Sequence, residues 1–282
     1  MKEEEKTAFI AFLTNVCLFL FKITAAIGSG SLAVLSSAFD SLNDIISYFI
    51  GYYTIKQTNK GPDEDHPFGH RRMEPLAAIL IAIFAGILAF EILKSAISNL
   101  LSNSHAVDIT FYTFGALIIT IIVKIGMHLS LKRTAKKTLS AALDAMSVDS
   151  RNDVLSNSVA LIGIIGAYLG QSMVDDIAAI IISVYIAYSG YRIAKKNFDY
   201  IVGARPDDST INLIAKKAKI PGVKKISRVR AHYVGDRVHA EIVIILEKDT
   251  PGPESHSIAV RVQRSVESIQ EVSHAFIHID YA

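Results

Sequence analysis

The stretches SSAFDSLNDIIS, residues 36–47, and SVDSRNDVLSNS, residues 147–158, decide how this chain must fold. Each stretch places two aspartates four residues apart inside a long, mostly apolar segment. On a helix this spacing stacks both carboxylates on one face, with Cβ atoms about 5–6 Å apart. A charged side chain inside a membrane span costs roughly 2.5–3.5 kcal/mol of free energy. The helix faces that carry the aspartates should therefore face each other or a water-filled cavity and not lipid.

The composition is that of an integral membrane protein with a smaller soluble part. Of the 282 residues, 51% are hydrophobic and 20% charged, and the mean hydropathy is +0.35, which is too apolar for an ordinary soluble protein. The net charge of +2 argues against a nucleic-acid partner, which would need a concentrated basic face. The single cysteine, Cys17, excludes a disulfide framework within the chain.

Six segments have the roughly 20 mostly apolar residues that a bilayer crossing needs. The N-terminus, the second and fourth connections and the exit of the sixth segment carry Lys and Arg, whereas the other connections carry none. Because basic residues near span ends set orientation, we expect both termini in the cytoplasm. The expected spans are Ala8–Ile27, Leu32–Ile55, Glu74–Ile97, Ile109–Leu131, Leu139–Leu169 and Met173–Ala194.

From Arg205 onward the composition becomes that of a soluble domain. Two strand-like runs flank a probable hairpin turn at Gly235-Asp236, and helix signals precede the first run and the last strand. We therefore predict an all-α, six-helix transmembrane domain over residues 1–204 and a small cytoplasmic α+β domain, of αββαβ order, over residues 205–282. The core of about 75 residues is thin, which favours association with a second copy.

The two aspartate pairs should lie near the bilayer midplane, because each pair lies about nine to fourteen residues into its span at about 1.5 Å per residue. Four carboxylates there would repel one another, and a divalent cation or protons can offset that repulsion. The alternative is that the aspartates pair with the intramembrane Lys22 or Lys124 or with Arg151. By its helical angle, Arg151 should point away from the aspartates.

With these features the chain resembles the cation diffusion facilitator family over nearly its whole length. The resemblance rests on the six spans, the DSLND and DSRND pairs, the segment DEDHPFGHRRME at residues 63–74, and the αββαβ, metallochaperone-like tail. It implies a homodimeric secondary transporter, not an enzyme and without a prosthetic group. Such a protein exports divalent transition-metal ions from the cytoplasm in exchange for protons. The expected location is the lipid bilayer of the cell (inner) membrane.

The resemblance places a transport site on Asp40, Asp44, Asp149 and Asp153. Zinc-transporting relatives commonly have His where Asp149 stands. Zinc favours nitrogen and sulfur ligands, whereas an all-oxygen site suits harder ions, so we expect Mn²⁺ or Fe²⁺. Zn²⁺, or a broad range that includes Cd²⁺, Co²⁺ and Ni²⁺, is the alternative.

The resemblance implies further sites outside the spans. A second metal site falls on Asp63, His66 and His70, although the histidines could instead only shape the loop and cap the third span. Arg72 matches a basic position that locks the family's dimer, but its usual acidic partner position is Val202 here. The tail would bind a regulatory metal ion, and its candidate ligands are His239, His256, His278 and Asp280.

Two other functions stay open. An intramembrane aspartyl protease also needs two buried aspartates on different helices, but neither pair here lies in a GxGD context. A membrane metal sensor without transport would need the ligands of the tail but would have no use for four carboxylates at the midplane.

Overall fold

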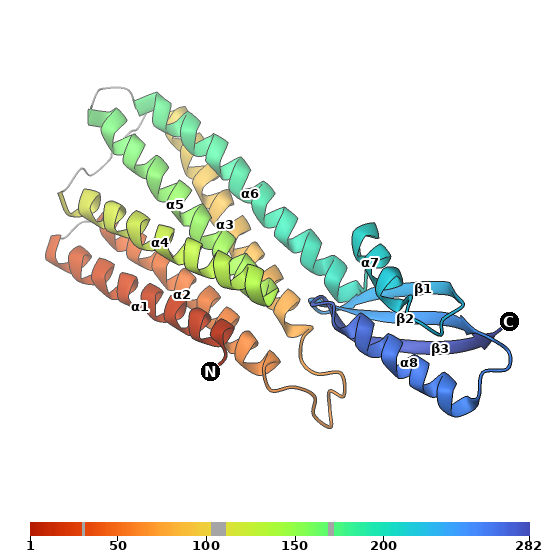
Figure 1. Ribbon diagram of the computed structural model, residues 1–282. Helices are drawn as coiled ribbons and strands as arrows, with labels where there is room; N and C mark the ends of the chain where they lie inside the picture. Colours follow the sequence, from red (N-terminus) through yellow and green to blue (C-terminus); the bar gives the residue numbers. More distant parts are fainter. Residues whose placement is uncertain (30–31, 103–110, 169–171) are drawn as a thin grey trace. The chain divides into compact units, whose positions relative to one another are not determined.

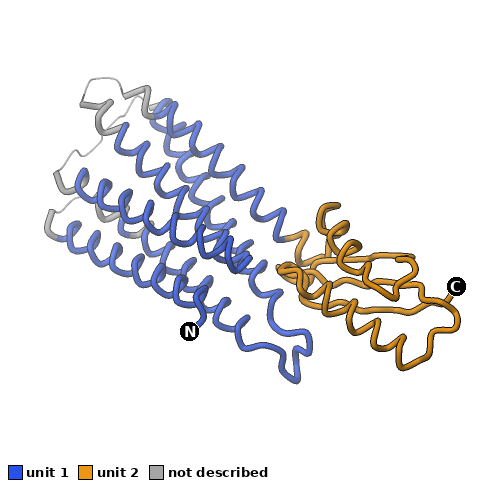
Figure 2. Tube along the Cα trace, viewed as in Figure 1, with its two compact units in different colours: residues 1–197 blue, residues 198–282 orange. Residues whose placement is uncertain are grey.

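The computed structural model describes residues 1–29, 32–102, 111–168 and 172–282. The side chains of residues 28–37, 39–40, 102–113 and 163–175 also lie outside the description. The chain divides into two compact units, residues 1–197 and 198–282 (Figure 2).

The described part of the first unit is a bundle of six long helices that lie side by side (Figure 1). Helices satisfy all their interior backbone hydrogen bonds within the segment, which suits apolar sequences that must sit in hydrocarbon. The six-helix prediction is confirmed, although the expected start of the fourth span, Ile109, and the expected end of the fifth, Leu169, lie outside the described residues. The helices are α1 (Glu3–Ser29), α2 (Leu32–Thr58), α3 (Met73–Ser102), α4 (Phe111–Thr138), α5 (Ala141–Tyr168) and α6 (Ser172–Val202).

Among the described residues, four helices are long and apolar enough to cross a membrane on length and composition alone. These are α1, α3, α4 and α6. The other two long helices, α2 and α5, carry the aspartate pairs that lower their hydropathy. The aspartates of the predicted site therefore lie on the two long helices that this criterion does not select among the described residues.

Small residues let the helices of the bundle approach one another closely, as is usual where lipid provides no hydrophobic drive between helices. Alanines from α1, α3, α4 and α5 belong to one buried core cluster together with Tyr48 of α2. In a second cluster, Ala85 and Ala89 of α3 pack against Ile186 of α6. One turn after Ile186, Gly190 approaches α3 so closely that an added Cβ would lie 3.1 Å from the carbonyl oxygen of Ala82.

The second unit is a three-stranded sheet with two helices, in the predicted αββαβ order. The strands β1 and β2 form an antiparallel hairpin at Gly235, whose positive φ of 65° suits the turn. The strand β3 pairs with β2 in parallel, so α8 provides the crossover. The elements are α7 (Asp208–Ala218), β1 (Lys225–Val234), β2 (Arg237–Leu246), α8 (Gly252–Glu267) and β3 (Val272–Tyr281).

The core of this unit lies between one face of the sheet and the two helices. Alternate residues of β2, from Ala240 to Leu246, are buried together with Ile214 of α7 and Val262 of α8. Because successive side chains of a strand point to opposite faces, His239 and Glu241 belong to the other face.

We predict that Gly190→Val destabilises the bundle, because the new side chain would press against the backbone of α3. Overpacking of this kind typically costs about 1–3 kcal/mol. The melting temperature followed by circular dichroism in detergent should fall. Gly126→Val is the matched control, since an added Cβ at Gly126 meets nothing within 4 Å. An equal loss in both variants would show that glycine itself, and not the close contact, matters.

Candidate metal centre

Three aspartates come together where α2 and α5 face each other. Asp44 of α2 and Asp149 and Asp153 of α5 each offer a carboxylate oxygen, and these oxygens lie within 4.8 Å of one another. Asp149 and Asp153 are each only 7% exposed. Asp40 precedes Asp44 by one turn of α2, and its side chain lies outside the described residues. The structure thus brings together the three members of the predicted set whose side chains it describes.

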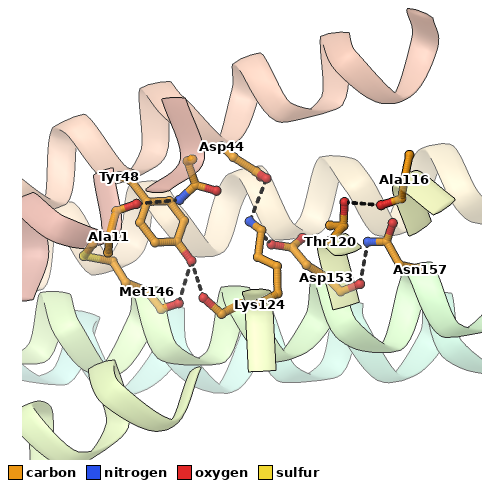
Figure 3. Close-up of polar contacts among 11 residues, drawn as sticks. Ala11, Asp44, Tyr48, Ala116, Thr120, Lys124, Met146, Asp153 and Asn157 are labelled. Atoms are coloured by element: carbon orange, nitrogen blue, oxygen red, sulfur yellow. Dashed lines mark hydrogen bonds and ion pairs between the residues drawn. The ribbon is translucent and has the colours of Figure 1, made fainter. Parts of the chain in front are cut away.

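A lysine from a third helix reaches into this cluster (Figure 3). The Nζ atom of Lys124, on α4, donates hydrogen bonds to Oδ2 of Asp44 at 2.8 Å and to Oδ2 of Asp153 at 2.5 Å. Lys124 is 1% exposed. Two of the three aspartates therefore pair with an intramembrane lysine, as the alternative interpretation predicted. The three aspartates also cluster as a cation site requires.

Tyr48 holds α2 against α5 beside the carboxylates. Its hydroxyl donates to the backbone oxygen of Met146 at 3.0 Å and lies 2.5 Å from Oγ of Ser150. The Nζ atom of Lys124 lies 5.2 Å from the centroid of the Tyr48 ring, within the range of a cation–π contact. Tyr48 therefore ties the helix that carries Asp44 to α5 and places its ring beside the lysine.

Three buried polar atoms on two residues of α5, Asp149 and Asn152, lack a hydrogen-bond partner among the described residues. They are Oδ2 of Asp149 and both polar atoms of the Asn152 side chain. Buried polar atoms are nearly always paired, because leaving one unpaired costs free energy. The carboxylate oxygens, with Oδ2 of Asp149 free of hydrogen bonds within the described part of the chain, form an oxygen donor set that fits a hard or borderline divalent cation.

Arg151 takes no part in this cluster. Its guanidinium donates to Oγ of Ser189 at 3.0 Å and lies 5.4 Å from the ring centroid of Tyr185, both on α6. The side chain points away from the aspartates, as its helical angle predicts.

Glu74 fixes the start of α5, and its role was not foreseen from the sequence. Its carboxylate is buried and accepts hydrogen bonds from Oγ of Ser140 at 2.5 Å and from the backbone N–H of Ala142 at 3.4 Å. A carboxylate is favourable there because the first N–H groups of a helix are unpaired and carry partial positive charge. The only signal in the sequence is an acidic residue in the first turn of α3.

The loop between α2 and α3 gathers its three candidate ligands. The two carboxylate oxygens of Asp63 lie 3.2 Å from Nδ1 of His66 and 3.2 Å from Nε2 of His70. The two imidazole rings are 4.5 Å apart at their centroids. Gly69, with φ of 78°, makes the turn that brings His70 back.

The electrostatics of this loop keep Asp63 ready to bind a cation. Slight desolvation raises the pKa of the Asp63 carboxyl, but hydrogen bonds from the backbone and ring of His66 and the nearby His70 outweigh it. The pKa therefore lies below its usual value, and the carboxylate stays ionised near neutral pH. Arg72, the dimer-contact candidate, is exposed just before α3, and its role stays a prediction.

In the tail the structure separates His239 from the other candidate ligands. Nε2 of His278 lies 3.3 Å from Oδ1 of Asp280, whereas His239 stands between His232 and His274, with ring centroids 6.0 and 5.2 Å away. His256 is exposed on α8. Across the described residues, clusters of three ligand atoms within 4.8 Å occur at the aspartates and the loop and not in the tail, so the tail site stays a prediction.

Comparisons with known proteins cover nearly the whole chain. The model of the cation efflux transmembrane domain matches residues 8–202, and that of the cation efflux protein cytoplasmic domain matches residues 206–282. An uncharacterized transporter of Methanocaldococcus jannaschii is 32% identical over 281 residues, which is 99% of each chain. The manganese efflux system protein MneS of Bacillus subtilis is 25% identical over 99% of this chain and 96% of its own.

Two further similarities are more limited in identity or extent. Metal tolerance protein 11 of Arabidopsis thaliana is 28% identical over 99% of this chain and 72% of its own. Among solved structures, a MamM CTD matches 27% of this chain and 98% of its own, with 25% identity and a TM-score of 0.26.

We predict that replacing His66 and His70 together by alanine removes one bound metal ion per chain, because two of three loop ligands are lost. Equilibrium binding of Mn²⁺ and Zn²⁺ to the purified protein would measure the stoichiometry. Asp65→Ala is the control, since Asp65 is exposed in the same loop and lies outside the cluster. An unchanged stoichiometry in the double variant would leave the histidines with a role in loop shape alone.

Proposed function

This chain belongs to the cation diffusion facilitator (cation efflux) family, and we propose that it exports Mn²⁺ or Fe²⁺ from the cytoplasm in exchange for protons. Family membership makes it a multi-pass membrane protein that moves divalent metal cations outward, and a transporter instead of an enzyme. The observation that carries the finer proposal is the cluster of Asp44, Asp149 and Asp153. Asp40, one turn before Asp44, would complete a tetrad.

The preference for Mn²⁺ or Fe²⁺ is supported by the donor atoms. The described ligand atoms are all carboxylate oxygens, which suit harder ions and tolerate added water, whereas zinc favours nitrogen and sulfur. One relative along nearly the whole chain is named a manganese efflux protein. Zn²⁺ is the alternative within the same family.

Exchange for protons is supported by the chemistry of the same carboxylates. Protons and metal ions bind the same oxygens, so each displaces the other. In an alternating-access cycle, the site would take up metal while open to the cytoplasm. Rocking of the helices would then open it outward, where protons displace the metal. No nucleotide-binding motif stands in the sequence to power the cycle otherwise.

We further propose a homodimer in the cell membrane with both termini in the cytoplasm. The family's cytoplasmic-domain model over residues 206–282 supports pairing through the tail, and the basic connections support the orientation. Residues 1–204 would carry transport, and the tail would respond to metal at His278 and Asp280, with Arg72 contributing to the dimer contact.

We predict that Asp153→Ala lowers metal export by about 100-fold or more, because even residues around a metal ligand usually contribute 10- to 100-fold to affinity. Uptake of Mn²⁺, Fe²⁺ and Zn²⁺ into proteoliposomes with an opposing proton gradient would measure it. The control is Asp144→Ala, which lies on the same helix but pairs with Lys196 at the surface. Normal metal export by Asp153→Ala would contradict the proposed transport site.

We predict that Asp149→His shifts the preference of the same proteoliposomes toward Zn²⁺, since an imidazole nitrogen replaces a carboxylate oxygen. The ratio of Zn²⁺ to Mn²⁺ uptake should rise relative to the unsubstituted protein. If the unsubstituted protein already prefers Zn²⁺, the choice of metal is set by the geometry of the site or by bound water and not by the type of ligand atom.

A further inference from the structure

We propose that the Lys124 ammonium is a tethered cation that competes with the substrate for the aspartate cluster, so that a divalent ion binds only when Lys124 withdraws. The inference rests on the proposed function, because it takes Asp44 and Asp153 as metal ligands. It assigns Lys124 a part in the affinity and charge specificity of transport.

The geometry makes lysine and metal mutually exclusive. One nitrogen bonds Oδ2 of Asp44 at 2.8 Å and Oδ2 of Asp153 at 2.5 Å, and so lies between carboxylates from two helices (Figure 3). A divalent transition-metal ion binds carboxylate oxygen at about 2.0–2.2 Å. An ion that bridged the same two oxygens would take the volume that Nζ fills.

Charge reinforces this exclusion. Lys124 is almost fully buried, so water cannot screen an ammonium group from a divalent ion held by the same oxygens. Nor can Lys124 simply lose its partners in place, because a buried, unpaired ammonium group is costly. The ring of Tyr48 lies 5.2 Å from Nζ and offers an electron-rich face toward which the group can move.

Two properties of transport follow from this competition. The apparent affinity for the metal ion is the affinity of the carboxylates alone multiplied by the fraction of molecules in which Lys124 is withdrawn. This lower affinity helps a transporter release its ion. A monovalent cation gains nothing over the ammonium that it must displace, whereas a divalent ion brings twice the charge to the same oxygens. Lys124 thus favours divalent over monovalent cations.

The test is equilibrium binding of Mn²⁺ to the purified full-length protein at one pH. Lys124→Gln removes the charge and keeps a polar side chain that is one atom shorter. The variant should bind Mn²⁺ about tenfold tighter or more, because an opposing interaction of about 1.4 kcal/mol is enough for a tenfold change. The matched control is Lys132→Gln, eight residues further along α4 and exposed, which should bind as the unsubstituted protein does. Equal or weaker binding by folded Lys124→Gln overturns the inference.

Asp153→Ala separates this inference from the proposed function. If Asp153→Ala loses Mn²⁺ binding but Lys124→Gln does not tighten it, the carboxylate site stands and the competing lysine does not. If Asp153→Ala binds Mn²⁺ as well as the unsubstituted protein does, the proposed site fails and the inference fails with it.

A second measurement uses the unsubstituted protein and so does not depend on folding of a variant. A structure determined with Mn²⁺ bound at Asp44 and Asp153 should show Nζ of Lys124 beyond hydrogen-bonding distance of both carboxylates. Nζ still bonded to both with the ion in place would overturn the inference. Lys124→Arg, which keeps the charge, should show no tightening of Mn²⁺ binding.

Discussion

The cost of holding carboxylates away from water shapes the membrane unit. Asp149 and Asp153 are buried on α5, and Asp44 faces them from α2. Buried charges of one sign persist only when opposite charge accompanies them. Lys124 supplies that charge from α4, so three helices meet at one polar point. Tyr48 and Glu74 then hold the two aspartate-bearing helices in place, one beside the cluster and one at the start of α5.

The aspartate cluster and Lys124 together show how one set of carboxylate oxygens could bind different cations in turn. The same carboxylates have an ammonium partner within the protein and a donor set that fits a divalent ion. Under the proposed function, the cluster would be a site where the Lys124 ammonium and a metal ion exchange, because both use the same carboxylate oxygens. Oδ2 of Asp149, which has no hydrogen-bond partner among the described residues, leaves further capacity for an ion or its water.

Sequence patterns predicted most of the fold because each rests on local periodicity. Apolar length predicted the helices, and helical spacing placed Asp149 and Asp153 on one face and Arg151 on another. The partners of the cluster were harder to predict, because which helix meets which, and at what rotation, depends on packing between distant segments. From the sequence, Lys124 was therefore only one of several possible partners for the aspartates, and Glu74 was not considered as a contact for the start of α5. The neighbours of His239 depend on the register between β2 and β3, which the sequence does not state.

The order of the helices bears on how the polar ones enter a bilayer at all. Among the described helices, α2 and α5 fall outside the set that length and composition mark as able to cross. Each follows an apolar helix, α1 or α4, after a short connection. Each polar segment is thus preceded along the chain by an apolar helix against which it packs. For α5 that apolar helix also carries Lys124, so the charge that neutralises Asp153 is synthesised just before it.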